Sequence, residues 1–344
     1  MKAHNKPEPG LHPFTAQDTR PIAGIPWNIT QVNAPSFWPH TRGGGAVVAV
    51  IDTGLDVTHK EFTGRIVAPH NFTSAAKQAD VTDIEGHGTH VAGIIAGATC
   101  GVAPEARIMP LKVFGDSKVD QNIIDAFNYI FHYNETCPEK DRVVAVNCSF
   151  GAGFYDAIMA WSIRRLVNSG VAVVVAAGNQ GDGDPSSQEI FSFPAYIWEV
   201  VTTAATNRDE GVAGYSNSFD GIDLAAPGTD IYSAWPGGGY KLLSGTSMAA
   251  PHVSGALALI YAQWRLREGR WPDEEQAFAV LLKHTSRLSL DPALVGRGML
   301  DLSFVHARWP LHRVQVGTYW NKSGAESTAA SLRKAGFKTY LVKY

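Results

Sequence analysis

Residues 245–253, Gly-Thr-Ser-Met-Ala-Ala-Pro-His-Val, open an apolar stretch that is typical of a buried helix. The helix predicted over residues 247–267 therefore begins with the small hydroxyl of Ser247. Unpaired backbone N–H groups and the helix dipole favour negative charge at such a position, so Ser247 can act as a nucleophile. It can equally be an ordinary N-cap, because serine is one of the residues preferred there. Other parts of the sequence decide between the two interpretations.

Two polar motifs lie upstream, each beside an apolar run. Residues 46–51 predict a buried parallel strand that stops at Asp52-Thr53-Gly54, at the carboxyl edge where open α/β sheets place their sites. Further on, His87 stands between glycines, in Gly-His-Gly-Thr-His, ahead of another apolar helix. The chain order Asp, His, Ser occurs among hydrolases in which the aspartate orients the histidine, and the histidine takes the proton from the attacking serine.

A fourth motif places an amide at the end of a strand. Residues 173–179 read Val-Val-Val-Ala-Ala-Gly-Asn. A tetrahedral intermediate needs fixed donors aimed at its oxyanion, and the side chain of Asn179 and the backbone N–H of Ser247 can supply two. An asparagine after a strand is otherwise most often a turn residue.

Taken together, the four motifs resemble those of the subtilisin-type serine endopeptidases in order and in approximate spacing. The resemblance covers roughly residues 25–302 and gives catalytic roles to Asp52, His87, Asn179 and Ser247. It implies an enzyme of broad specificity that hydrolyses peptide bonds in proteins through an acyl-enzyme on Ser247. His87 would act as base and then as acid, and Asp52 would hold its tautomer.

Length and composition agree with this resemblance. A chain of 344 residues, 45% hydrophobic and 18% charged, can bury the core of one α/β domain with small appendages. Strand-like and helical patterns alternate, which predicts a three-layer fold with a parallel sheet and helices on both faces. The expected strands are residues 46–51, 107–113, 143–149, 171–176 and 199–204, and the expected helices are 123–133, 155–169, 247–267 and 274–284. The net charge of −3 and the absence of basic runs from the sequence argue against a nucleic-acid partner, and no membrane partner is expected.

Substrate-binding positions follow from the same resemblance. Residues 149–151 would pair with extended substrate, where backbone hydrogen bonds give affinity. Residues 176–178 would form a wall of the first specificity pocket. Ser192 would lie at the base of that pocket and Gln180 at its rim, where many relatives carry glutamate. We therefore expect a roomy, uncharged pocket with little preference for basic side chains. The matching residues are Ser149, Phe150 and Gly151, then Ala176, Ala177 and Gly178, and finally Gln180 and Ser192.

The chemistry requires no cofactor, and calcium is the cation to consider. Many subtilisins carry a Ca²⁺-binding loop inserted in the helix after the catalytic histidine, but residues 96–102 here run on directly. Glu61 matches the remaining carboxylate and cannot alone supply the 6–8 oxygens that calcium needs. A weaker cation site near Ala195, Ile197 and Asp223 stays open as an alternative.

The cysteines and the first residues bear on the compartment. Three cysteines without metal-ligand spacing favour free thiols in a reducing cytosol. Residues 1–10 have no apolar core of a secretory signal peptide. Both features resemble the intracellular branch of the family, whose members suggest a cytoplasmic homodimer.

An N-terminal extension, residues 1–24, precedes the predicted peptidase domain. Its Leu11-His12-Pro13-Phe14 resembles the inhibitory motif of that branch, Leu-Ile-Pro followed by Tyr or Phe, with His12 in place of Ile. In the family this segment lies across the cleft like a substrate, and its proline displaces the bond that would be cut. Proline suits that role because it fixes φ and removes an N–H donor. The alternative is a disordered proline-rich tail.

The C-terminal region follows a linker over residues 303–311. Residues 312–344 show a β-α-β pattern that resembles half of a sporulation-related repeat, whose full form binds glycan strands of the bacterial cell wall. Since one half-unit is present, a structural tail is the alternative. A different class of function also stays open, namely a cell-wall or spore-associated protein that binds peptidoglycan and uses its protease domain as a scaffold.

Overall fold

The computed structural model describes residues 10–11, 15–19, 22–74, 77–189, 192–303 and 322–334. The chain divides into two compact units, residues 1–305 and 306–344, and each is described by itself.

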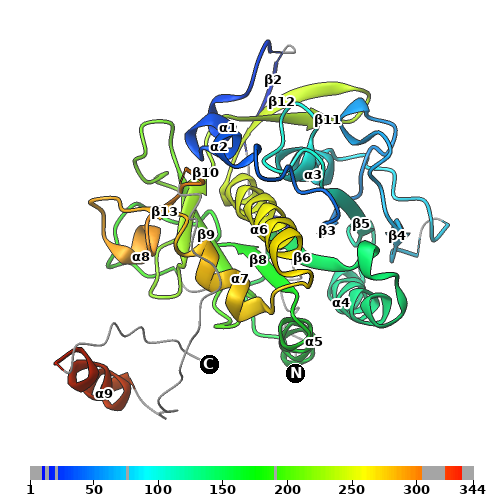
Figure 1. Ribbon diagram of the computed structural model, residues 1–344. Helices are drawn as coiled ribbons and strands as arrows, with labels where there is room; N and C mark the ends of the chain where they lie inside the picture. The colour runs from blue at the N-terminus through cyan, green and yellow to red at the C-terminus, as the bar shows by residue number, and fades with distance from the viewer. Residues whose placement is uncertain are drawn as a thin grey trace, which may run out of the picture. The chain divides into compact units, whose positions relative to one another are not determined.

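Buried apolar runs form the central strands of a sheet in the first unit (Figure 1). Within the described residues this sheet has nine strands, in the order β13-β14-β10-β9-β8-β6-β3-β5-β4. The neighbouring strands from β14 to β4 are parallel, and only the edge strand β13 pairs antiparallel, with β14, so the sheet is mostly parallel, as the predicted three-layer α/β fold requires. The strands are β3 (Val47–Asp52), β4 (His70–Asn71), β5 (Arg107–Lys112), β6 (Val143–Cys148), β8 (Ala172–Ala176), β9 (Val201–Thr206), β10 (Leu224–Pro227), β13 (Thr285–Ser286) and β14 (Met299–Leu300).

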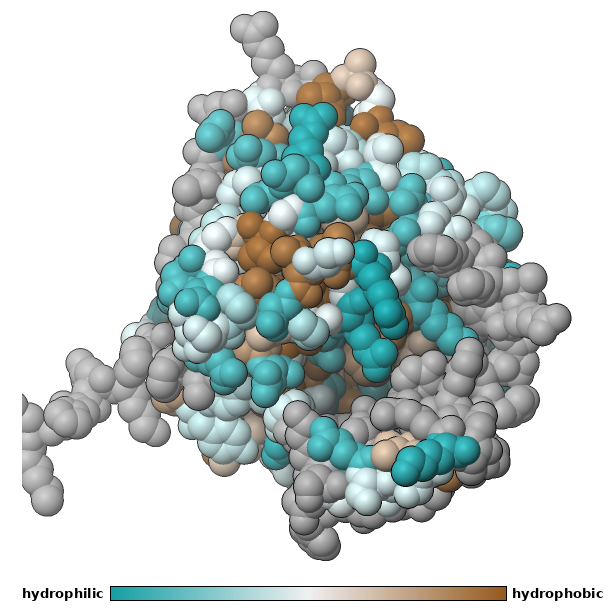
Figure 2. Space-filling model, turned by 90° about the vertical axis from the view of Figure 1, so that its left-hand side faces the viewer, coloured by the Kyte–Doolittle hydropathy of each residue, from teal (hydrophilic) through white to brown (hydrophobic). Residues whose placement is uncertain are grey.

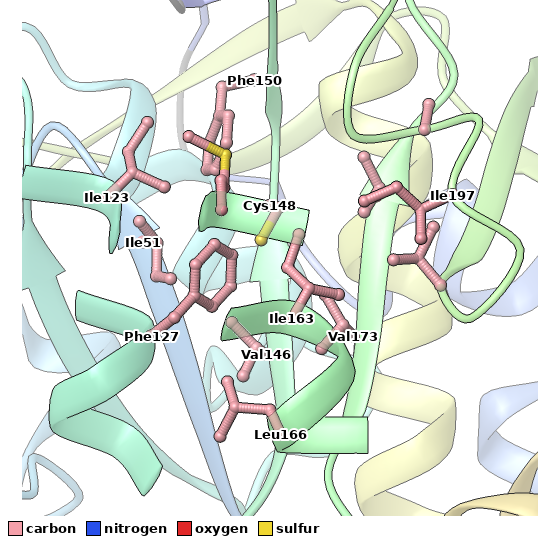
Figure 3. Packing of buried hydrophobic residues seen from close by; sticks show 14 of the residues in the cluster. Ile51, Ile123, Phe127, Val146, Cys148, Phe150, Ile163, Leu166, Val173 and Ile197 are labelled. Carbon is pink, nitrogen blue, oxygen red and sulfur yellow. The ribbon is translucent and has the colours of Figure 1, made fainter. Parts of the chain in front are cut away.

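Helices cover both faces of the sheet, as predicted. Side chains alternate between the faces of a strand, and Val47, Ala49 and Ile51 of β3 pack in one cluster with residues of α4 (Val119–Thr136) and α5 (Ala157–Asn168). Figure 3 shows this packing of the two helices against the strands. Other helices that contact the sheet include α3 (His87–Ala96), α6 (Thr246–Glu268), α7 (Glu274–Leu281) and the short α8 (Pro292–Val295).

The remaining helices of the first unit are short. They are α1 (Trp27–Gln31), α2 (Ala34–Phe37) and the 3₁₀ turns η1 (Lys60–Phe62) and η2 (Glu139–Asp141).

Local sequence sets where the longer helices begin. The carboxylate of Asp156 caps α5 by accepting from the N–H groups of Ile158 and Met159. Asp273 and Gln276 form a capping box at the start of α7. These side chains satisfy N–H groups that have no partner within their own helix.

Helix α6 starts earlier than the sequence pattern predicts. Its N-cap is Gly245 and Ser247 is the second helical residue, so the N-cap interpretation of Ser247 is wrong. Pro251 lies inside the helix. From this position it removes the helical donor for the carbonyl of Ser247, four residues earlier.

Two small sheets stand apart from the large one, and the sequence pattern does not predict them. One contains β11 (Ile231–Trp235), β12 (Gly239–Ser244) and β2 (Thr15–Asp18), in the order β11-β12-β2. In the other, β1 (Gly10–Leu11) pairs antiparallel with β7 (Phe150–Gly151). Both sheets therefore include a strand of the N-terminal extension.

Hydrophilic residues surround a smaller hydrophobic group on the face of the molecule shown in Figure 2. None of the helices within the described ranges is long and apolar enough to cross a membrane.

In the second unit the described part is helix α9 (Lys322–Lys334), where the sequence predicts a helix. The two strands that the predicted β-α-β pattern places on either side of this helix lie outside the described residues. The β-α-β pattern and the linker boundaries stay predictions.

Candidate active site

The sheet topology brings two of the polar motifs to one edge. Strand β3 ends at Asp52, and Ile51 is in register with Cys148, the last residue of β6. Asp52 follows Ile51 and Ser149 follows Cys148, so Asp52 and Ser149 both lie at the carboxyl edge of these neighbouring strands. Asn179 lies three residues beyond the last residue of β8, the strand next to β6.

Asp52 and His87 form a fully buried pair. The Nδ1 atom of His87 lies 2.8 Å from Oδ1 and 3.0 Å from Oδ2 of Asp52. Oδ1 also accepts from the backbone N–H of Thr53 at 2.7 Å. A carboxylate only accepts, so Nδ1 carries the proton and the lone pair of the neutral ring lies on Nε2. This is the tautomer that a general base requires.

Asp83, which the sequence analysis does not single out, connects Thr53 to the histidine helix. Its carboxylate accepts from the hydroxyl of Thr53 at 2.9 Å, from the N–H of Gly86 at 2.8 Å, and from the N–H and hydroxyl of Thr89 at 2.9 and 2.6 Å. The hydroxyl of Thr53 in turn accepts from the N–H of Gly88 at 2.9 Å. A carboxylate just ahead of a helix is a capping signal, and that signal could have identified Asp83.

Ser247 lies in the first turn of α6 and is fully buried. Its hydroxyl donates to the carbonyl of Ser149 at 3.2 Å. The predicted nucleophile is thereby placed next to the residue that follows β6, at the edge that carries Asp52.

Asn179 is oriented by Thr246, the residue before Ser247. The amide oxygen of Asn179 accepts from the N–H and the hydroxyl of Thr246 at 2.8 and 2.7 Å. Because two donors need an oxygen there, the amide nitrogen is the end that can donate toward an oxyanion.

The predicted substrate strand is β7, and its backbone edge is paired with β1. Ala152, the next residue, exchanges two backbone hydrogen bonds with Phe193 at 2.8 and 2.9 Å, which ties the strand to the segment expected at the pocket base. The side chain of Phe150 is fully buried and meets Phe114 edge to face at 6.1 Å between ring centroids. The side chain of Phe150 therefore lies in the core, while its backbone belongs to the edge that pairs with β1.

The expected pocket wall and rim follow β8. Ala176 and Ala177 are fully buried, and Ser192 is nearly so. Gln180 is exposed and exchanges hydrogen bonds with Asn217, whose oxygen accepts from the Gln180 N–H at 2.7 Å. Of the predicted N-terminal motif, Leu11 packs against the core, whereas His12, Pro13 and Phe14 lie outside the described residues.

Comparison with known proteins decides the family. Residues 43–306 match the model of the family described as "Subtilase family". The chain belongs to the subtilase family.

Two bacterial relatives cover most of this subtilase. It is 38% identical over 291 residues to "Intracellular serine protease" of Paenibacillus polymyxa, which covers 82% of this chain and 86% of the relative. It is 36% identical over 300 residues to "Major intracellular serine protease" of Bacillus subtilis (strain 168), which covers 84% of this chain and 91% of the relative. A fungal relative, "Subtilisin-like serine protease Pen ch 13" of Penicillium rubens, is 36% identical over 253 residues, 68% of this chain and 61% of the relative. The chain is a subtilisin-type serine endopeptidase and acts on protein substrates.

In this subtilase, hydrogen-bond donors of the protein surround Glu61, the carboxylate that the calcium prediction considers. Glu61 accepts from the N–H and the hydroxyl of Thr99 at 2.7 and 2.5 Å and from the hydroxyl of Tyr240 at 2.7 Å. Burial raises the pKa of Glu61, but these hydrogen bonds outweigh it, and the pKa lies below its ordinary value.

The weaker cation candidates lie close to one threonine. The hydroxyl of Thr202 donates to the carbonyl of Ala195 at 2.5 Å, and its N–H donates to Asp223 at 2.8 Å. The carbonyl of Ile197 accepts from the N–H of Val200 at 3.3 Å. Within the described ranges no group of three or more His, Cys, Asp or Glu side chains is arranged to hold a metal ion.

Proposed function

We propose that this subtilase cleaves peptide bonds by acyl transfer through Ser247, with His87, Asp52 and Asn179 in the roles that the motifs predict. The buried contact between His87 and Asp52 is the observation that carries the proposal. It is supported by the orientation of Asn179, because an oxyanion donor must be held before charge develops.

The steps follow from these positions. The Ser247 hydroxyl turns from the Ser149 carbonyl to His87 and attacks the scissile carbonyl, and His87 Nε2 takes its proton. The N–H of Ser247 and the amide nitrogen of Asn179 hold the oxyanion. His87 then gives the proton to the leaving amine, and the C–N bond breaks. Water, activated by the same ring, hydrolyses the acyl-enzyme and restores Ser247.

Hydrolysis of casein and of a chromogenic peptide ending in Phe or Leu tests this mechanism. We expect Ser247→Ala and fluorophosphonate-treated protein to lose activity by at least about a thousandfold. The exposed residue Ser36 serves as control, since Ser36→Ala should behave like the unchanged protein. Equal activity of Ser247→Ala and the unchanged protein would exclude Ser247 as the nucleophile.

The first specificity pocket is proposed to be uncharged. Gln180 is neutral and lies at the expected rim, so no carboxylate at that position favours a basic side chain. A panel of peptides that differ at the residue before the cut should show Leu or Phe cleaved better than Lys. Gln180→Glu should raise the cleavage of the Lys peptide relative to the others, and strong selectivity of the unchanged protein for Lys would contradict the proposal.

The N-terminal extension is proposed to inhibit the enzyme. The pairing of β1 with β7 supports this, because it occupies the backbone edge that substrate would use. Leu11 adds apolar contact with the core. We expect deletion of residues 1–17 to raise the initial rate of casein hydrolysis, and equal rates with and without these residues would rule out inhibition.

We further propose that the enzyme works in the cytoplasm and needs no bound metal for chemistry. The names of the two bacterial relatives support an intracellular site of action. Cys100, Cys137 and Cys148 are free, which suits a reducing compartment. Cell fractionation tests this, and recovery of the protein in the culture medium would contradict it.

The C-terminal unit is proposed to be an accessory segment, with dimerisation or glycan binding as its role. Helix α9, between two predicted strands, supports the half-repeat. Analytical ultracentrifugation of Ser247→Ala with and without residues 306–344 tests dimerisation. Sedimentation with purified peptidoglycan tests the alternative function of a wall-associated scaffold, which predicts that the protein leaves the supernatant.

A further inference from the structure

The first unit has a pocket with a volume of about 370 Å³ that the catalytic mechanism does not use. Its lining among the described residues consists of three aromatic side chains, one carboxylate, one amide and two glycines. None of the predicted catalytic or substrate-binding residues is among these described lining residues. The volume lies within the range of about 300–1,000 Å³ that is typical of small-molecule sites. The pocket is therefore a candidate for a second, separate binding site.

Two of the aromatic rings come from the segment after the expected base of the specificity pocket. Ile197 is buried and packs in the core cluster (Figure 3), and its two neighbours lie nearer the surface. Tyr196 is half-buried, and its ring centroid lies 5.7 Å from that of Phe193. Trp198 is 48% exposed. Contact with the core thus holds Tyr196, while Trp198 offers a large ring to a ligand.

The third ring comes from the turn before β10. Phe219 is nearly buried, and its carbonyl accepts from the N–H of Ile222 at 3.2 Å, which closes the turn. Gly221 lies inside this turn and also lines the pocket. A Cβ atom added to Gly221 would lie 2.6 Å from Cε2 of Phe219. The absence of a side chain at position 221 therefore keeps space beside the ring.

The charge that lines the pocket is negative. Asp220 is the charged member of the described lining residues, and its side chain is exposed. Arg164 is balanced by the carboxylate of Glu199, which follows Trp198, at 2.8 Å from Nε to Oε1. The charge of Arg297 acts on Asp223. A cation that enters the pocket would thus be attracted by the carboxylate of Asp220.

Aromatic rings and one carboxylate together suit an organic cation. The faces of such rings attract positive charge, and an alkylated ammonium group also buries apolar surface against them. A metal ion suits the lining less well, because it needs several oxygen, nitrogen or sulfur ligands. We propose that this pocket binds a small organic cation of the alkylated ammonium class, with Tyr196, Trp198 and Phe219 around its alkyl groups and Asp220 as its counter-ion.

Binding of choline to the full chain tests this. The protein is labelled with ¹⁵N-tryptophan in the Ser247→Ala background, which prevents self-digestion, and NMR follows the indole N–H signals. Trp198→Phe identifies the signal of Trp198 by its loss. Trp161 is the internal control, since it is 56% exposed and its ring centroid already lies 4.8 Å from the guanidinium carbon of Arg165.

We expect choline to shift the Trp198 signal with a Kd of about 1 mM and to leave the Trp161 signal in place. The neutral analogue in which carbon replaces the choline nitrogen should bind about tenfold more weakly. Potassium chloride at the same concentration should shift neither signal. An acetylated lysine amide should also bind more weakly than choline, because its primary ammonium is more strongly hydrated.

Two carboxylate variants locate the counter-ion. Asp220→Asn should weaken choline binding by about fivefold, since it removes the charge that lines the pocket. Asp209→Asn is the matched control, because Asp209 is exposed and is not among the described lining residues, and it should keep the parent affinity. Equal affinities of Asp220→Asn and the parent would exclude Asp220 as the counter-ion and overturn the proposal.

The parent protein alone decides the outcome if a variant fails to fold. Equal affinity for choline and its neutral analogue, or an equal shift with potassium chloride, overturns the proposal. Tighter binding of the lysine amide than of choline overturns the choice of an alkylated ammonium and indicates a lysine side chain of a protein partner. Since no peptide bond is cut in these measurements, their result is independent of the proposed proteolytic function.

Discussion

Ser149 and Ser247 exchange two hydrogen bonds across the active-site edge. The Ser149 hydroxyl donates to the Ser247 carbonyl at 2.9 Å, and the Ser247 hydroxyl donates to the Ser149 carbonyl at 3.2 Å. Pro251 has no N–H to give to the Ser247 carbonyl, so the Ser149 hydroxyl takes the place of the missing helical donor. Asn147 sets the direction of that hydroxyl by donating to its oxygen at 2.9 Å.

Replacement of Ser149 by alanine should therefore lower kcat more than it raises KM. The Ser247 carbonyl would lose its donor, and the first turn of α6 would move by enough to misplace the nucleophile. We expect kcat to fall by about tenfold, which corresponds to about 1.4 kcal/mol. Steady-state kinetics on a chromogenic peptide measure this.

Pro251→Ala provides the control for Ser149. It restores an N–H four residues after Ser247, so the double variant Ser149→Ala with Pro251→Ala should recover most of the lost kcat. If the double variant recovers none of the kcat lost in Ser149→Ala, the carbonyl of Ser247 is not the group through which Ser149 acts.

The Asp83 network predicts a matched pair of variants at Thr53. The Thr53 hydroxyl donates to Asp83 and accepts from Gly88, beside His87. Thr53→Val removes that hydroxyl at nearly constant volume and should lower kcat by about tenfold, since an unmade buried hydrogen bond costs about 1–3 kcal/mol. Thr53→Ser keeps the hydroxyl and should stay within about twofold of the unchanged protein. Equal kcat values for the two variants would show that the network does not position the histidine.

Asn179→Ala tests the proposed oxyanion donor. In subtilisin, the loss of such an asparagine costs about 100- to 1,000-fold in kcat, and that measured range is adopted here. KM should change little, because the oxyanion forms only in the transition state. Thr246→Ser retains both donors to the Asn179 oxygen and should remain active. An unchanged kcat of Asn179→Ala would remove Asn179 from the mechanism.

The sequence predicts the large sheet well for a physical reason. Strands such as residues 143–148 and 172–176 are fully buried, so their apolar runs are continuous and end at turn residues. The sequence predicts the start of α6 one residue too late, because Gly245 and Thr246 resemble a turn.

Other parts of the site depend on contacts that no local pattern contains. Ser149 and Ser247 are 98 residues apart in the chain, and Lys241 and Asp18 belong to strands that pair only in the fold. Half-buried and buried residues follow one another in an irregular order along strand β12, so its period of two is weak. Register and long-range pairing had to come from the structure.

The contacts of Glu61 predict that a chelator has little effect on stability. Thr99 and Tyr240 already donate to both carboxylate oxygens. We expect an unchanged Tm in excess EDTA, measured on Ser247→Ala to prevent self-digestion. Tyr240→Phe should lower Tm by about 3–6 °C, because a hydrogen bond to a charged group contributes about 1.5–3 kcal/mol. A fall of many degrees in chelator would show that a bound cation stabilises the fold.

Asp223 predicts how stability depends on pH. Burial raises its pKa from 3.8 to about 7, although the N–H of Thr202 and the charge of Arg297 act in the opposite direction. Between about pH 4 and pH 7 the folded protein keeps a proton on Asp223 that the unfolded chain has lost. The unfolded state then binds fewer protons, so this group makes the free energy of unfolding fall as pH rises, by roughly 4 kcal/mol at most.

Asp223→Asn removes that titration and keeps the shape of the side chain. Relative to the unchanged side chain, the variant should gain stability steadily from pH 4.5 to pH 7 and no further by pH 8.5. Urea unfolding at these pH values, in the Ser247→Ala background, measures the difference. Asp220→Asn, at an exposed neighbouring position, should follow the parent curve. Parallel curves for Asp223→Asn and its parent would mean that Asp223 is ionised in the folded protein, and that Arg297 and Thr202 offset its burial.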